Sequence, residues 1–295
     1  MTPMTHRGAV ATMIAVTLMW SIAGVVTRHL EAARAFEVTF WRSLFNALTL
    51  IGLLGALRGP RALFASIRDG GRTLWLSGVC WAVMYTAFML ALTLTTVANV
   101  LVTMAIAPLF TALVARFALG HRLASRTWAA ILVAGLGIAW MYAREVGGGD
   151  GRHVLGTAVA LAVPVAAAVN WVLIQHNRGA RQLDLLPAVL IGALLSSAIT
   201  LPLALPFAAS VRDVALLGML GAVQLAIPCL LSVIAARALN APEVSLLALL
   251  EVVFGVAWAW LGAGESPSVH VLGGGLLVLL ALAGNEALAL REQKA

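Results

Sequence analysis

Ten long apolar stretches, separated by short polar segments, take up most of this 295-residue sequence. A helix that crosses the hydrocarbon core of a bilayer needs about 20 apolar residues, and each stretch reaches or approaches that length. Ten such helices leave only short connections, so the sequence predicts an all-α integral membrane protein without a separate soluble domain. The predicted helices are 8–27, 38–57, 73–94, 97–119, 127–142, 154–174, 186–207, 214–236, 243–261 and 269–289.

The composition supports a membrane protein. Hydrophobic residues make up 62% of the chain and charged residues 11%, whereas soluble domains average about 45–50% and about 25%. The net charge of +7 does not indicate a nucleic-acid partner, because the basic residues lie between apolar stretches instead of on one face of a soluble module. Cys80 and Cys229 are far apart in apolar stretches, which favours packing over a metal or redox site. We expect no nucleic acid, metal or cofactor.

The basic residues also predict the orientation of the helices. Arginine and lysine accumulate in the cytoplasmic connections of membrane proteins. If the amino terminus is inside, the inner segments hold 13 of the 19 basic residues, the outer connections hold 5, and Arg42 lies within a helix. We therefore expect both termini in the cytoplasm.

A weak internal similarity divides the chain into two halves. After a shift of 144 residues, 99–141 overlies 243–285, and both segments contain a long helix, a glycine-polar turn and a second helix. If each half has five helices, an odd number, the halves have opposite orientations in the membrane, as in many secondary transporters. We expect repeats at 1–145 and 146–295 within one membrane domain, with a substrate site near the midplane between them.

Glu251 is the first functional candidate. It lies near the middle of the apolar run 240–265, where an ionisable side chain is costly unless a partner, a cavity or a proton makes it tolerable. Trp258 follows two turns later on the same helical face. A carboxyl group that binds substrate or carries a proton is one interpretation, and a paired or protonated carboxyl that joins two helices is the other.

Other polar and aromatic side chains in the predicted helices form a candidate substrate site. Arg42 offers a planar fork to a carboxylate, or its long stem carries the guanidinium to the membrane interface. Amides at membrane depth bind substrate or join helices, and aromatic stripes are stacking platforms or core. Pro108 bends the fourth helix to open a cavity, or packing absorbs the bend. The substrate-binding candidates are Trp20, Arg42, Trp81, Tyr85, Asn99, Trp171, Gln175, Gln224, Glu251 and Trp258, and the gating or coupling candidates are Pro108 and Glu251.

Several short motifs follow one another along nearly the whole chain. They are Trp20-Ser21, Phe40-Trp41-Arg42, Ala107-Pro108, Leu250-Glu251, Gly264-Glu265 and Gly273-Gly274-Gly275. In this order and spacing the chain resembles the drug/metabolite transporter superfamily, specifically its EamA-type family of ten-helix bacterial exporters. Two positions depart from the family pattern. Gly120-His121 stands where Gly-Glu is usual, and Val252 follows Glu251 where proline is common, which argues against equivalent movement of the two halves.

The resemblance implies two inverted five-helix repeats around a central cavity, with the fifth and tenth helices at the periphery. It also implies a secondary transporter that exports amino acids or similar small metabolites across the bacterial inner membrane by alternating access. The aromatic candidates favour an aromatic amino acid, with Glu251 meeting an ammonium group or carrying a proton. The alternatives are a multidrug or nucleotide-sugar carrier and, outside transport, an intramembrane enzyme or a scaffold. We expect no enzymatic activity, and a monomer in the bilayer as the working unit.

Overall fold

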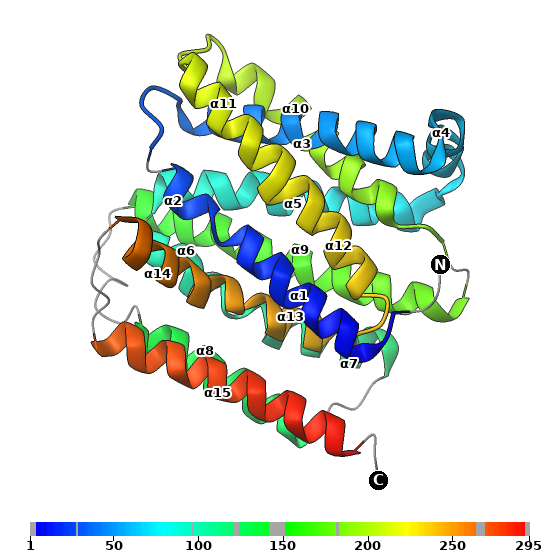
Figure 1. Cartoon of the computed structure of the whole chain (residues 1–295), viewed down its shortest axis with the longest axis vertical. Coiled ribbons are helices and arrows are strands. Elements are labelled where there is room, and N and C mark those ends of the chain that lie inside the picture. Colours follow the sequence, from blue (N-terminus) through cyan, green and yellow to red (C-terminus); the bar gives the residue numbers. More distant parts are fainter. Residues whose placement is uncertain are drawn as a thin grey trace.

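The computed structural model describes residues 4–27, 29–95, 97–120, 124–141, 151–180, 183–263 and 269–292. Throughout these ranges the regular structure is helical (Figure 1). Six helical stretches are long and apolar enough to cross a membrane, and three shorter apolar helices accompany them. The predicted all-α membrane fold is confirmed.

Each predicted stretch corresponds to one helix or to a helix that is interrupted. The first half contains α1 (His6–Trp20), α2 (Ala23–Thr27), α3 (Ala35–Arg58), α4 (Pro60–Asp69), α5 (Gly71–Leu94), α6 (Val97–Met104), α7 (Ala107–Leu119) and α8 (Ser125–Met141). The second half contains α9 (Gly151–Ala180), α10 (Leu186–Ala204), α11 (Val211–Met219), the π-helical segment η1 (Leu220–Ala226), α12 (Ile227–Ala235), α13 (Ala241–Ala248), α14 (Leu250–Ala263) and α15 (Val269–Glu292).

Helix α4 was not predicted. It has 10 residues, so it is too short to be recognised as a spanning segment. Gly59 and Gly71 flank it with φ angles of +82° and +60°, left-handed values that glycine adopts without steric cost. Pro60 occupies its first turn, where proline is favoured. These residues turn the chain at both ends of α4, so that the helix forms a separate link between α3 and α5.

The helices pack into one bundle with a peripheral pair. Helix α5 contacts α9 and α10, α3 contacts α10 and η1, and α1 contacts α12, α13 and α14. Helices α8 and α15 pack mainly against each other and lie at one edge of the bundle (Figure 1). Gly137 permits their close approach, because a Cβ atom at this position would lie 2.8 Å from the carbonyl oxygen of Gly274. The fifth and tenth spans are therefore peripheral, as the resemblance implied.

Two spans are interrupted at equivalent positions of the two halves. The break between α6 and α7 includes Ala105, and the break between α13 and α14 falls at Leu249. These residues are related by the 144-residue shift. Pro108 lies in the first turn of α7, as expected for a proline-induced bend, whereas Val252 stands at the equivalent position after the second break. The second half therefore bends without the proline, which the sequence did not predict.

Ionic contacts join the helix ends at one end of the bundle, here called the Asp184 end. Arg58 and Arg237 both pair with Asp184, the latter at 3.0 Å between Nη2 and Oδ1. His6 Nε2 lies 2.6 Å from Glu243 Oε1, which connects the start of α1 to the start of α13. Burial lowers the pKa of the Arg237 guanidinium, and the carboxylate of Asp184 keeps this charge paired. The Asp184 end thus links helices from both halves.

Two buried carboxylates connect the halves at the opposite end, here called the Asp213 end. Glu37 of α3 accepts hydrogen bonds from the backbone N–H groups of residues 208–209 at 2.8–3.0 Å. Asp213 of α11 accepts hydrogen bonds from the backbone N–H groups of residues 31–33 at 2.9–3.0 Å. Both carboxylate residues are fully buried. Each half therefore supplies the acceptor for a loop of the other half.

Candidate functional site

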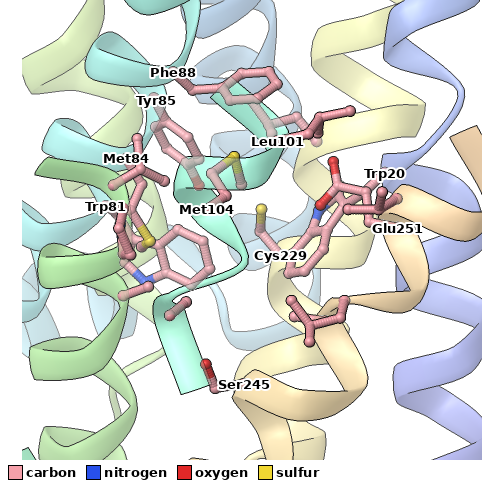
Figure 2. Close-up of a pocket in the computed structure, with 18 of the residues that line it drawn as sticks. Trp20, Trp81, Met84, Tyr85, Phe88, Leu101, Met104, Cys229, Ser245 and Glu251 are labelled. Atoms are coloured by element: carbon pink, nitrogen blue, oxygen red, sulfur yellow. The ribbon is translucent and has the colours of Figure 1, made fainter. Parts of the chain in front are cut away.

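A cavity lies between the two halves of the bundle, and Figure 2 shows side chains pointing into it from several helices. Its empty space, including the opening, is about 940 Å³. Most of the lining side chains are apolar or aromatic, with a small number of polar groups, as is typical of small-molecule sites. Seven of the predicted site residues line it: Trp20, Arg42, Trp81, Tyr85, Trp171, Gln224 and Glu251.

Two predicted site residues join helices instead of lining the cavity. The side-chain oxygen of Gln175 accepts a hydrogen bond of 2.7 Å from the backbone N–H of Ala241, which satisfies one of the free donors at the start of α13. The indole nitrogen of Trp258 donates to Ser21 Oγ at 3.0 Å, which links α14 to α1. For these two residues the described geometry favours the helix-joining interpretation.

The remaining two candidates lie in the interrupted span α6–α7. Pro108 is buried in the first turn of α7, and its neighbour Ala107 lines the cavity. Pro108 itself is not among the lining residues, and it lies directly after one of them in the chain. Asn99 belongs to α6, but its side chain lies outside the described residues.

Arg42 is held inside the bundle. Its side chain belongs to a residue that is only 3% exposed and that lines the cavity, so its guanidinium does not extend to the membrane interface. The close packing of η1 on α3 fixes this part of the helix. A Cβ atom on Gly221 of η1 would lie 2.6 Å from the Arg42 carbonyl oxygen and 2.8 Å from the backbone nitrogen of Asn46, so glycine is required there. Short π-helical segments of this kind are frequent at functional sites.

Arg42 and Glu251 place a guanidinium group and a carboxyl group in the same cavity. They come from α3 and α14, one from each half, and are close enough to interact electrostatically. Within the described structure no ion pair joins them, and Arg42 Nε has no hydrogen-bond partner. A charged group without a partner is costly in a low-dielectric site. A ligand with an anionic group and a cationic group would therefore stabilise the charged forms of both side chains.

An aromatic wall forms one side of the cavity. Trp81 and Tyr85 of α5 have ring centroids 5.6 Å apart, and Trp81 meets Trp171 of α9 edge-on at 5.8 Å. Figure 2 shows Trp81 and Tyr85 across the cavity from Glu251. Close packing of α10 positions this wall, because a Cβ atom on Gly192 would lie 2.3 Å from Trp81 Cβ. The wall offers flat apolar surface for an aromatic group.

Gln224 combines both roles that were expected for a buried amide. Its Nε2 donates to the backbone carbonyl of Trp20 at 2.9 Å, which joins η1 to α1. Its Oε1 has no hydrogen-bond partner among the described residues, although Gln224 lines the cavity. One end of the amide is therefore structural, and the other is available to a ligand.

The cavity lining follows the internal repeat. Six pairs of lining residues are related by the 144-residue shift: Trp20 and Pro164, Trp81 and Leu225, Tyr85 and Cys229, Leu101 and Ser245, Met104 and Ala248, and Ala107 and Glu251. Cys229 was expected to be a packing residue, but it lines the cavity. Ser245 was not predicted as a site residue. The shift itself was the available signal, since it maps Tyr85 onto Cys229.

This helical fold and its central cavity define a multi-pass membrane protein built for a small molecule. The sequence belongs to the EamA-like transporter family, which matches residues 7–143 and 154–285. The resemblance seen in the short motifs is confirmed, and the chain is a membrane transporter by family. The boundary predicted between 145 and 146 lies between the two matched ranges and stays a prediction.

Comparison with individual proteins adds the fold but no substrate. No curated protein matches the sequence. A solved structure described only as "Crystal structure of protein" is similar with a TM-score of 0.78 and 19% sequence identity, over 96% of this chain and 98% of its own. At this identity the likeness concerns the fold alone.

Proposed function

We propose that this protein is a secondary transporter that exports amino acids, and aromatic amino acids in particular, by alternating access. The observation that carries the proposal is the combination, in one cavity, of a guanidinium, a carboxylate and an aromatic wall. Arg42 would hold the substrate carboxylate through charge-assisted hydrogen bonds. Glu251 would meet the ammonium group, and Trp81 and Tyr85 would contact the ring.

Alternating access fits the interrupted spans. The breaks at Ala105 and Leu249 fall at equivalent positions of two halves that the repeat predicts to be inverted. In secondary transporters the coupling sites commonly lie where spanning helices are discontinuous. Movement of one half against the other around these breaks would expose the cavity to each side in turn, with Glu251 beside the second break as the candidate for coupling to a proton.

The cavity disfavours the rival substrates. A flat organic cation would gain from the aromatic wall and from Glu251, but it would also lie near the buried charge of Arg42, with no group to pair with it. A nucleotide sugar carries phosphate groups, and Arg42 is the single basic side chain among the described residues that line the cavity. A zwitterionic amino acid would pair its carboxylate with Arg42 and its ammonium group with Glu251.

Transport by the purified protein tests the proposal. Reconstituted into liposomes that are loaded with unlabelled tyrosine, it is expected to accumulate radiolabelled tyrosine by exchange, and protein-free liposomes are the control. Unlabelled tryptophan should compete, whereas ethidium and UDP-glucose should not. Competition by ethidium alone would replace the proposal with a multidrug carrier. Absence of any solute movement, together with turnover of a lipid or peptide, would favour an enzyme.

We also propose that the protein lies in the bacterial inner membrane with both termini in the cytoplasm. Arginines from predicted inner connections, Arg58 and Arg237, meet at the Asp184 end, and α1 begins and α15 ends on the same side of the bundle (Figure 1). Green fluorescent protein fused after Ala295 is expected to fluoresce, while alkaline phosphatase fused there should be inactive. Active phosphatase would place the carboxyl terminus in the periplasm and contradict this topology.

A further inference from the structure

The two halves contribute side chains of different size to the cavity. At five of the six pairs related by the 144-residue shift, the first half has the larger residue, as in Met104 against Ala248 and Leu101 against Ser245. In the sixth pair, Ala107 of the first half is equivalent to Glu251 of the second half. The second half therefore contributes the smaller side chains to the lining, and it also contributes the carboxylate.

Ser245 adds an unused polar group on this side. Its residue is 1% exposed, it lines the cavity, and its Oγ has no hydrogen-bond partner in the described parts of the chain. A buried hydroxyl is normally paired. The equivalent position of the first half holds the apolar Leu101. The repeat alone therefore does not require a polar residue at position 245. The unpaired hydroxyl points to a ligand.

The break at Leu249 allows Ser245 and Glu251 to line the same cavity. Residues six positions apart in a continuous α-helix point about 120° away from each other, since each residue turns the helix by about 100°. At the break the N–H of Leu249 bonds to the carbonyl of Leu246, three residues back, instead of four. Figure 2 shows Ser245 and Glu251 at separate places on the cavity wall, so the two side chains can contact different ends of one ligand.

The aromatic wall carries two further polar groups without a hydrogen-bond partner among the described residues, the indole N–H of Trp81 and the hydroxyl of Tyr85. Both residues line the cavity, and Trp81 is only 2% exposed. Ser245 can donate and accept, whereas the indole of Trp81 can only donate. Together they suit a ring that carries a hydrogen-bonding group, and a plain phenyl ring would leave both unpaired.

We propose that Ser245 recognises a polar group on the aromatic ring of the substrate, so that the transporter prefers tyrosine over phenylalanine. This inference rests on the proposed function and specifies its substrate class further. Sites with buried polar groups reject analogues that lack the matching group, because the site is then left unpaired. The ring would lie against Trp81 and Tyr85, the small side chain of Ala248 would leave it space in the cavity, and the hydroxyl of Ser245 would select among rings.

Binding of tyrosine and phenylalanine, which differ by one hydroxyl, tests this proposal. With wild-type protein in detergent, tyrosine is expected to bind at least about tenfold more tightly than phenylalanine. Ser245→Ala should weaken tyrosine binding by about five- to tenfold and leave phenylalanine binding unchanged within about twofold. The matched control is Ser197→Ala, since the Ser197 hydroxyl is buried but already donates to the Ala193 carbonyl within α10.

A pair of size variants tests the position of the ring. Ala248→Met is expected to weaken binding of both amino acids at least about tenfold, because overpacking fills the room beside the second half. The swap Met104→Ala with Ala248→Met preserves total volume but moves the room to the first half, and it should not restore binding. Thermal melting of each variant confirms that it folds.

The outcomes separate the two proposals. If wild-type protein binds neither tyrosine nor phenylalanine, the proposed function fails. If it binds both with equal affinity, or if Ser245→Ala weakens both equally, the role of Ser245 is overturned and the amino-acid transporter stands. Full restoration by the size swap would overturn the position assigned to the ring.

Discussion

Replacing Glu251 with glutamine is expected to lower the rate of tyrosine exchange in proteoliposomes by at least about tenfold and to abolish its pH dependence. Glutamine has nearly the same shape, but it can neither neutralise an ammonium group nor carry a proton. Hydrogen bonds to charged groups contribute about 1.5–3 kcal/mol, which corresponds to a factor of about 10 to 150. Initial rates measured from pH 5 to pH 9, normalised to the amount of reconstituted protein, give both quantities.

Two comparisons make the Glu251 result specific. Glu251→Asp retains the charge and should keep part of the activity and its pH dependence. The analogue 3-(4-hydroxyphenyl)propionate lacks the ammonium group, so its affinity should not change in Glu251→Gln, while that of tyrosine falls toward the same level. Unchanged tyrosine binding together with unchanged pH dependence would remove Glu251 from the mechanism, although the family would still identify a transporter.

Replacing Arg42 with methionine is expected to weaken tyrosine binding by about 10- to 150-fold, because the substrate carboxylate loses its charged partner. Tyramine, which lacks the carboxylate, should bind as well as before or better, since the buried positive charge is gone. Arg42→Lys keeps the charge but not the planar fork, and we expect an intermediate affinity for tyrosine. Equilibrium binding of radiolabelled tyrosine, with tyramine as competitor, provides the measurement.

The comparison between ligands also controls for damage to the protein. Arg42 is buried beside η1, so its replacement could disturb packing and weaken every ligand. A loss confined to tyrosine assigns the effect to the carboxylate, whereas equal losses for tyrosine and tyramine would show that Arg42 supports the bundle instead of the substrate. Size-exclusion profiles of the variants identify any that fail to fold.

The spans and the two repeats were predictable because a bilayer imposes a simple pattern on a sequence. Every crossing helix needs a continuous apolar stretch, and a charge within one stands out. Arg42 and Glu251 were therefore found from sequence, and the structure brings both to one cavity. Helix α4 was not predicted, because a helix of 10 residues that does not cross the membrane needs no continuous apolar stretch.

The roles of the two long amides could not be separated by sequence. Gln175 and Gln224 both occur at membrane depth, and a helical wheel shows only which face each occupies. Gln175 accepts a hydrogen bond from the first turn of α13, whereas Gln224 keeps one oxygen for the cavity. This difference depends on which neighbouring helix end reaches the side chain, and that information lies in the tertiary structure.

Among the irregularities of the helix backbone, one was predictable from the sequence and others were not. Pro108 predicted the break in the first half, because proline removes a backbone hydrogen bond. The break at Leu249 has no proline at the position equivalent to Pro108, where Val252 stands. The π-helical segment η1 ends just before Pro228, which cannot donate a hydrogen bond to the carbonyl of Gln224. The break at Leu249 was not predicted from the sequence, and the close contact between Gly221 and the α3 backbone appears only once the helices are packed.

The buried carboxylates at the Asp213 end limit how the two halves can move. Pulling the halves apart there would leave Glu37 and Asp213, each of which accepts several backbone hydrogen bonds, as charges without partners. Movement that keeps each loop with its acceptor retains those hydrogen bonds. Residues 208–209 would therefore move together with α3, and residues 31–33 together with α11, whichever side of the membrane the cavity opens to.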